Sequence, residues 1–316
     1  MYHPLVSIII PTRNRAYILK HAISSCISQT YRNVEIIVVD DNSSDSTKRV
    51  VQEVSKEYSN IVYIRNRVHK GLPASRNIGL QYARGELIFF SEDDLILLPN
   101  TLEVLVNTYI SLSRRLKLGA VAPRLILVST SLSYSPIPEC KKIIGIFNEL
   151  TGAEHCANYD VPSNHILLSA HPPATSLIPK RVFNDVGTYY TGYKYNYVYE
   201  DSDLYFRLIK SGYILIYQPK AIAYHVSGNP GGCTTTALKK YFLADNYNLL
   251  LFNLRMFHLG GLPRTLLSLI RRAARVRYLK NSKKLFEEIS ILDKIGYRYS
   301  YWKLIKNYVH LLKSIY

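Results

Sequence analysis

Short apolar runs alternate with stretches of helical spacing over the first hundred residues of the chain. The apolar runs are rich in β-branched side chains, which is typical of strands buried in a parallel sheet. The predicted strands are Val6–Ile10, Val34–Val39, Ile61–Arg65 and Glu86–Ser91. The predicted helices cover residues 16–29, about 46–58 and 71–83. Strand, loop and helix repeated in this order predict an α/β fold with a mostly parallel central sheet and right-handed crossovers.

Residues that interrupt a strand or cap a helix predict where these elements begin and end. Pro11 lacks a backbone N–H and is expected to end the first strand. Ser43, Ser44 and Asp45 offer side-chain oxygens that can cap the second helix. Both boundaries therefore place polar residues directly after a buried strand.

The stretch GELIFFSEDDLILLP, residues 85–99, combines a buried strand with a dense acidic cluster. Its apolar run ends in three consecutive acids, Glu92, Asp93 and Asp94. Adjacent carboxylates repel one another, and a divalent cation such as Mg²⁺ or Mn²⁺ removes that repulsion because it prefers hard oxygen ligands. The alternative is an acidic loop that only caps the following helix.

A second predicted strand also ends in acids, Asp40 and Asp41. The carboxyl ends of parallel strands meet at one edge of a sheet, so we expect these acids to converge with the acidic triplet where nucleotides bind. There a carboxylate such as Asp41 can accept a hydrogen bond from a base N–H. Neither GxGxxG nor GxxxxGK[ST] occurs in the sequence, which excludes a dinucleotide Rossmann site and a P-loop.

The second half of the chain is less regular. Leu118–Val128 predicts another strand, whereas residues 129–166 show no clean period. Two short strands are predicted over Tyr213–Tyr217 and Ala221–Tyr224, with His225 directly after them. A lone histidine at a strand end is usually structural, and a role as a metal ligand is the alternative.

Two features of residues 189–203 bear on chemistry. Six tyrosines lie between positions 189 and 199. Their rings could stack on a bound ligand, or pack on one another in a surface loop. The run Glu200-Asp201-Ser202-Asp203 then opens a helix, where acids are favoured by the helix dipole, so a capping role is one interpretation.

Composition narrows the class of protein. The chain has 316 residues and an apolar fraction of 47%, which is ordinary for a globular protein and long enough for a full core. No run of apolar residues is long enough to predict a transmembrane helix, and the N-terminus lacks the pattern of a secretory signal. Four scattered cysteines form no CxxC pair, so a reducing cytoplasm is the expected compartment.

Positive charge is concentrated at the C-terminus. Residues 239–316 hold 16 Lys and Arg against 4 Asp and Glu, which accounts for most of the net charge of +17. Helices are predicted over residues 238–258, 264–280 and 301–315. In the second of these, Arg264, Arg271, Arg272 and Arg275 share one arc of the helix. Basic amphipathic helices of this kind suit an anionic membrane surface, and the alternative is a helix packed on the preceding domain with a solvated basic face.

Five segments, in this order and spacing, resemble glycosyltransferase family 2. They are SIIIPTRNR, EIIVVDDNSSD, KGLPASRNIGL, ARGELIFFSEDD and YEDSDLYFRLIKSGY, and together they span about residues 5–225. The resemblance implies a GT-A fold and transfer of a sugar, with inversion, from a nucleotide-diphosphate donor to an acceptor hydroxyl. It also implies that a divalent cation, Mg²⁺ or Mn²⁺, assists the reaction.

The resemblance assigns roles to individual residues of the donor side. Pro11, Thr12 and Arg13 correspond to the first nucleotide loop, and Asp41 to the acid that contacts the base. Lys70 and Arg76 lie in the segment near the donor phosphates, and Asp93 corresponds to the acid that contacts the ribose or the metal. The expected metal ligands are Asp94, Glu92 and His225. The family usually has aspartate at the position of Glu92.

The same resemblance assigns the catalytic residues. Asp201 corresponds to the base that takes the acceptor proton as its oxygen attacks, and Glu200 is expected close to the acceptor. Direct displacement with inversion needs one such carboxylate.

The sequence therefore predicts a GT-A catalytic domain over residues 1–230 and a basic, mainly helical region over 231–316. The nucleotide-binding half covers about 1–116 and the acceptor half about 117–230. We expect a nucleotide-sugar donor, a glycan or lipid-phosphate-linked acceptor, and attachment to the inner face of the cell membrane, without nucleic acid as a partner. Three alternatives remain: a catalytically inactive GT-A relative, a basic nucleic-acid-binding protein, and a sugar nucleotidyltransferase. The last would need a glycine-rich loop where this chain has Pro11-Thr12-Arg13-Asn14.

Overall fold

A computed structural model describes residues 2–128, 143–148, 153–155, 159–226, 238–258 and 265. Two compact units share the chain. The first consists of Met1–Ile146 with Glu154–Asn248, and the second of Phe147–Ala153 with Leu249–Tyr316. We describe each unit separately, and the predicted domain boundary near residue 230 stays a prediction.

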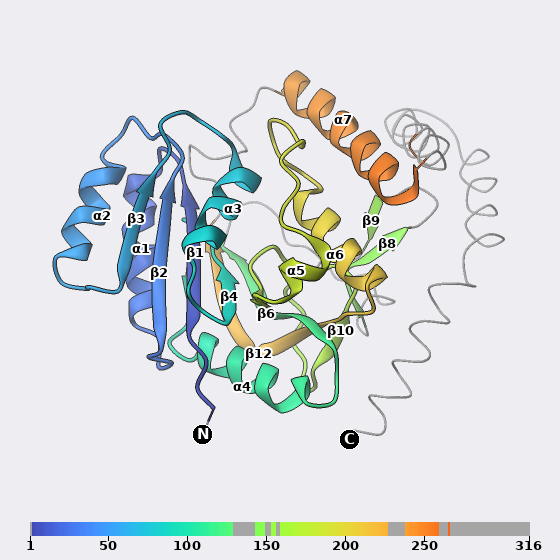
Figure 1. Ribbon diagram of the computed structural model, residues 1–316, viewed down its shortest axis with the longest axis horizontal. Coiled ribbons are helices and arrows are strands. Elements are labelled where there is room, and N and C mark those ends of the chain that lie inside the picture. Colours follow the sequence, from blue (N-terminus) through green and yellow to red (C-terminus); the bar gives the residue numbers. More distant parts are fainter. Residues whose placement is uncertain are drawn as a thin grey trace. The chain divides into compact units, whose positions relative to one another are not determined.

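A ten-stranded mixed sheet forms the centre of the first unit (Figure 1). Its first four strands run parallel in the order β3-β2-β1-β4. They are β1 (Val6–Thr12), β2 (Val34–Asp40), β3 (Ile61–Arg65) and β4 (Leu87–Phe90). All four coincide closely with the predicted strands, and their carboxyl ends share one edge.

The sheet continues beyond β4 in a mixed arrangement. The added strands are β5 (Leu95–Leu97), β6 (Leu118–Val128), β7 (Ile143–Ile144), β10 (Leu167–Ser169), β11 (Leu177–Pro179) and β12 (Ile214–Val226). β11 is antiparallel to β4, and β6 is parallel to β12. A separate two-stranded sheet consists of β8 (Ile146–Asn148) and β9 (Ala153–His155).

Seven helices belong to the described residues. They are α1 (Ala16–Ile27), α2 (Thr47–Ser55), α3 (Leu72–Tyr82), α4 (Thr101–Ser113), α5 (Val182–Val186), α6 (Glu200–Lys210) and α7 (Leu238–Phe257). The core on one face of the sheet combines Ile9, Ile37 and Phe90 with side chains of α3, α5 and α6. α4 packs against β6 and β12. Alternate strand residues point to opposite faces of a sheet, so helices can pack on each face. The helices packed on this sheet confirm the predicted α/β architecture with flanking helices.

Pro11 does not end the first strand, as the sequence had suggested. β1 continues to Thr12 and pairs with β2 along its whole length, whereas β4 ends opposite Ile9. The carbonyl oxygen of Ile9 points to the β4 side, where it accepts a hydrogen bond from Ser91 N, and by alternation the backbone of Pro11 faces the same side. None of the described strands pairs with β1 at Pro11 on that side, so its missing N–H leaves no ladder hydrogen bond unmade and the proline is tolerated.

The two short strands predicted over 213–224 are a single strand. β12 runs from Ile214 to Val226 and pairs with β6 throughout, with an irregular register between Gln218 and Ile222. Pro219 lies within that irregularity, which is where a proline fits inside a sheet. His225 is consequently inside the strand rather than after it.

Asp45 is the residue that begins two helices. Its carboxylate accepts from Thr47 N at 3.0 Å, at the start of α2, and from Ala16 N at 3.0 Å, at the start of α1. Ser43 instead accepts from Asn14 N at 2.9 Å. One acid thus satisfies N–H groups that have no partner within either helix.

In the second unit, Phe252 and Met256 of α7 are buried, and Asn253 Nδ2 donates to Thr265 Oγ1 at 3.0 Å. None of the helices in the described part of the chain is both long and apolar enough to cross a lipid bilayer. The predicted helices over 264–280 and 301–315, with the arginine arc and the expected membrane surface, lie outside the described residues apart from Thr265.

Candidate active site

Three acids after β4 lie at the carboxyl edge of the parallel strands, but they have different surroundings. Asp93 is 5% exposed and accepts from Thr12 Oγ1 at 2.8 Å and from Arg15 Nη1 at 2.9 Å. Burial raises the pKa of the Asp93 carboxyl to about 7, although the Arg15 guanidinium acts in the opposite direction. Asp93 is therefore oriented by β1 and by the loop that follows it.

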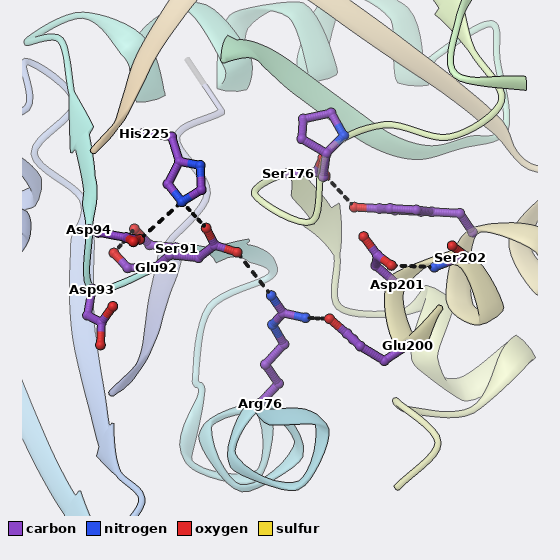
Figure 2. Close-up of polar contacts among 12 residues, drawn as sticks. Arg76, Ser91, Glu92, Asp93, Asp94, Ser176, Glu200, Asp201, Ser202 and His225 are labelled. Carbon is purple, nitrogen blue, oxygen red and sulfur yellow. Dashed lines mark hydrogen bonds and ion pairs between the residues drawn. The ribbon is translucent and has the colours of Figure 1, made fainter. Parts of the chain in front are cut away.

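Asp94, Glu92 and His225 form a cluster. His225 Nε2 lies 3.4 Å from Glu92 Oε2 and 3.4 Å from Asp94 Oδ1, and the ligand atoms of the three residues all lie within 4.8 Å of one another. Figure 2 shows the imidazole between the two carboxylates. The pairing of β12 with β5 sets this approach, because His225 is opposite Leu95 and Val226 N donates to Asp94 O at 3.0 Å.

The charges of this cluster depend on one another. Burial tends to lower the pKa of His225, but Asp94 and Glu92 raise it to about 9. Burial tends to raise the pKa of Asp94, but His225 and Arg15 hold it below its usual value. Arg15 Nη2 lies 2.6 Å from Asp94 Oδ2, so one guanidinium engages both aspartates. Two carboxylates and an imidazole are a donor set that fits a divalent ion.

Arg76 of α3 joins this cluster to the start of α6. Its side chain is 1% exposed, pairs with Glu200, and lies 3.6 Å from Glu92 Oε1 through Nη2. Figure 2 shows the guanidinium between the two glutamates. Burial raises the pKa of Glu200 to about 8, although Arg76 opposes this, and Glu200 Oε2 has no hydrogen-bond partner among the described residues. Arg76 was expected near the donor phosphates; it is engaged here by two carboxylates.

Asp201 follows Glu200 on the first turn of α6. Its Oδ1 accepts from Ser202 N at 2.8 Å and lies 3.9 Å from His171 Nε2, and its side chain is 23% exposed. His171 itself is buried, with Nε2 2.9 Å from Ser202 Oγ and Nδ1 2.7 Å from the Tyr159 hydroxyl. Asp201 thus keeps access to solvent, while a buried histidine lies directly behind it.

Asp41 lies at the end of β2 and receives four hydrogen bonds. Asn66 Nδ2 and Lys70 N each donate to Oδ1 at 2.8 Å, Gly71 N donates to Oδ2 at 2.8 Å, and His69 Nδ1 lies 2.6 Å from Oδ2. Burial alone would raise the pKa of Asp41, but these donors outweigh it and lower that pKa. Asp41 is therefore a buried anion.

The remaining residues predicted to contact the donor differ in their exposure to solvent. Lys70 donates its backbone N–H to Asp41, and Lys70 itself is exposed. Arg13 is exposed as well, whereas Thr12 is buried against Asp93. Pro11 lies within β1, one residue before Thr12.

The tyrosine-rich segment contains both buried and exposed rings. The buried ones are Tyr189, Tyr193 and Tyr199. Tyr195 is 62% exposed, and Asn248 braces the segment by accepting from Lys194 N at 2.9 Å and donating to Lys194 O at 3.0 Å. Within this segment, the backbone φ is positive at Tyr195, Tyr197 and Tyr199. Packing within the loop accounts for the buried rings, and stacking of the exposed ring on an acceptor stays a prediction.

Arg15 and His171 were not anticipated from the sequence. Arg15 is the second arginine of TRNR. It could have been predicted, because three adjacent acids require positive charge nearby. His171 carries no such signal, since it lies 30 residues before Asp201 in the less regular half of the chain.

Comparison with known proteins relates part of the chain to a family of enzymes. Residues 7–119 match the profile of Glycosyl transferase family 2. Residues 7–119 are therefore similar to this family. A solved structure of GalNAc-T7 with UDP, GalNAc and Mn²⁺ has a TM-score of 0.60 and 18% identity, covering 76% of this chain and 47% of that one. At that identity the likeness concerns the fold, which is GT-A.

Named relatives are similar to part of the chain. A GalNAc(5)-diNAcBac-PP-undecaprenol beta-1,3-glucosyltransferase of Campylobacter jejuni is 44% identical over 105 residues, 33% of this chain and 34% of the relative. A UDP-Glc:alpha-D-GlcNAc-diphosphoundecaprenol beta-1,3-glucosyltransferase of Escherichia coli is 42% identical over 103 residues, covering 33% and 40%. An uncharacterized glycosyltransferase of Rickettsia typhi is 28% identical over 209 residues, covering 66% and 60%. The matched part thus spans between one third and three fifths of these relatives.

Proposed function

We propose that the protein transfers a sugar, with inversion, from a nucleotide-diphosphate donor to a hydroxyl of a lipid-linked glycan. The observation that carries this proposal is the cluster of Glu92, Asp94 and His225 at the carboxyl end of β4, joined through Arg76 to the helix that begins with Glu200 and Asp201. The names of the Campylobacter and Escherichia relatives support the acceptor class, because both name a diphosphate-linked undecaprenol.

Glu92, Asp94 and His225 would hold the divalent ion, Mn²⁺ or Mg²⁺. When bound, the ion supplies positive charge that stabilises the leaving diphosphate. Asp94 is already oriented by Arg15, whose guanidinium also fixes Asp93. Asp93 is in this way held in place to accept from the donor ribose.

Asp41 would accept from the base, with Pro11 and Thr12 forming the wall beside it. The exposed side chains of Arg13 and Lys70 are free to move toward the phosphates, in contrast to Arg76. Arg76 would contribute by holding Glu92 and Glu200 in place rather than by contacting the phosphates.

Asp201 would accept the proton of the attacking acceptor hydroxyl. Its first-turn position on α6 and its partial exposure leave one oxygen edge accessible to an acceptor. Glu200, fixed by Arg76, would lie beside the acceptor and complete the wall of the site.

We place the protein on the inner face of the cell membrane as a peripheral protein. The support is the lipid-linked acceptor class of the relatives and the basic surplus of residues 239–316. Attachment through the predicted arginine arc remains part of this proposal.

The decisive experiment measures UDP binding by calorimetry with and without Mn²⁺. We expect wild-type binding to require Mn²⁺, and Asp94→Ala to weaken the Mn²⁺-dependent binding on the order of a hundredfold, because a direct ligand contributes more than a second-layer partner. Glu57→Ala removes an exposed acid of the surface and should bind as the wild type does. Equal affinity of Asp94→Ala and wild type in Mn²⁺ would contradict the metal assignment.

Transfer is tested with radiolabelled UDP-glucose and an undecaprenyl-diphosphate-linked N-acetylglucosamine. Labelled lipid supports the proposed acceptor class. Metal-dependent UDP binding without turnover of any nucleotide sugar would indicate an inactive relative. Salt-sensitive RNA binding without UDP binding would indicate a nucleic-acid-binding protein instead.

A further inference from the structure

The carboxylate of Asp41 has no unused hydrogen-bonding position. A carboxylate offers about four lone-pair sites, two on each oxygen. Asn66 and the Lys70 N–H fill those of Oδ1, and the Gly71 N–H and His69 fill those of Oδ2. A base N–H can therefore reach Asp41 only if one of these four donors leaves.

Three of the four donors are not free to leave. The N–H groups of Lys70 and Gly71 belong to the backbone that leads into α3, and Gly71 has a φ of 91°. A Cβ at Gly71 would lie 2.3 Å from the Tyr197 hydroxyl oxygen, so this turn is closely covered. The amide of Asn66 is buried, at 5% exposure. Moving the Asn66 amide or the Gly71 N–H would leave a buried donor without a partner, and the Lys70 N–H is tied to the same stretch of backbone as that of Gly71.

His69 differs from the other three donors. Its side chain is 40% exposed, and Nδ1 lies 2.6 Å from Asp41 Oδ2. Because Asp41 is an anion and can only accept, Nδ1 must carry the proton and donate. The imidazole can rotate into solvent and form hydrogen bonds with water, so its departure leaves no buried group unsatisfied.

We propose that His69 occupies the position of the donor base on Asp41 and must be displaced when a nucleotide binds, which makes it a specificity-determining residue. The proposal rests on the proposed function, since it requires a nucleotide donor at Asp41. The vacated position would take a ring N–H flanked by carbonyl groups, as in uracil or thymine. A ring nitrogen with a lone pair, as in cytosine, would be repelled by the carboxylate.

The test compares UDP and CDP binding, by calorimetry in Mn²⁺, to the wild type and three variants. His69→Ala removes the competing donor, so we expect about tenfold tighter UDP binding, as for the loss of one hydrogen bond to a charged group. His69→Asn keeps an N–H near the position of Nδ1 and should bind UDP as the wild type does. Val68→Ala alters a neighbouring exposed side chain and should also leave UDP affinity unchanged. CDP should bind weakly to all four proteins.

Each other outcome has a separate meaning. Equal UDP affinity of His69→Ala and wild type, with unchanged melting temperatures, would overturn the proposal. Weaker UDP binding by His69→Ala would also overturn it, because His69 would then be a contact of the nucleotide. Equal binding of UDP and CDP by the wild type would remove Asp41 as the reader of the base. If the wild type binds neither nucleotide, the proposed function fails, whatever the role of His69.

Discussion

Two carboxylates of the proposed site are held in different ways, Asp41 in the predicted nucleotide-binding (donor) half and Glu200 in the predicted acceptor half. On the donor half, Asp41 is held by groups from β2 to the start of α3, within about one βα unit. On the acceptor half, Glu200 depends on Arg76, which lies 124 residues away in the chain. The first carboxylate has a lowered pKa and four donors, whereas the second has a raised pKa and one oxygen without a partner in the described structure. Asp41 is thus held by groups at most 30 residues away in the chain, whereas Glu200 depends on a contact between distant segments.

The largest effect is expected from breaking the long-range pair. Arg76→Met would leave Glu200 as an unpaired buried acid, at a cost of about 3–5 kcal/mol in the free energy of unfolding. Urea unfolding of the purified variant measures this. The double variant Arg76→Met/Glu200→Gln removes both charges and should recover much of the loss. Arg49→Met breaks a pair whose arginine is 76% exposed, and should change the stability by less than about 1 kcal/mol.

Loss of the proposed base should affect turnover without affecting the donor half. Asp201→Asn preserves size but cannot accept a proton at neutral pH, so we expect turnover of UDP-glucose to fall on the order of a hundredfold. UDP affinity in Mn²⁺ should remain that of the wild type. A variant with wild-type turnover would show that Asp201 only caps α6.

His171 tests whether the acceptor half positions its base. His171→Asn should lower kcat by about tenfold, because the buried group behind Asp201 is lost while UDP binding on the other half is untouched. Kinetics and calorimetry on the same preparation separate the two effects. Equal losses in kcat and UDP affinity, together with a lower melting temperature, would mean that His171 serves only the fold.

The smallest effect concerns pH and the donor half. Glu35 is buried and accepts from Ser7 Oγ at 2.5 Å and from Arg84 Nε at 2.8 Å. Burial tends to raise the pKa of Glu35, but these hydrogen bonds outweigh it and lower that pKa. The stabilisation is therefore complete above the unfolded value, about pH 4.3, and disappears as the pH falls through the lower folded value.

Glu35→Gln should accordingly be less stable than the wild type by about 1 kcal/mol at pH 6, a figure kept small because the Arg84 side chain is 76% exposed. The difference should shrink between pH 5 and pH 3. Urea unfolding at several pH values measures it, and a difference that grows toward low pH would contradict the lowered pKa.

The sequence was informative where function depends on neighbours in the chain. The parallel strands and the helices between them follow from local periodicity, and the two acidic strand ends can be seen directly in the sequence. The family motifs added roles for Asp41, Asp94 and Asp201. The ends of β1 and β12 were less predictable, because each strand contains a proline. A proline is tolerated in a strand where the neighbouring strand is absent or its register is irregular, and the sequence does not show where that is so.

Only the tertiary structure decided which residues from distant parts of the chain meet. The pairing of β12 with β5 brings His225 to Asp94, and burial of α3 directs Arg76 to Glu200 rather than to open solvent. The sequence alone determined that a sheet with acids at its carboxyl edge would form, because hydrophobic periodicity acts over a few residues. The choice of partners for those acids depends on strand register and on the cost of leaving a buried charge unpaired, and both exist only once the chain has folded.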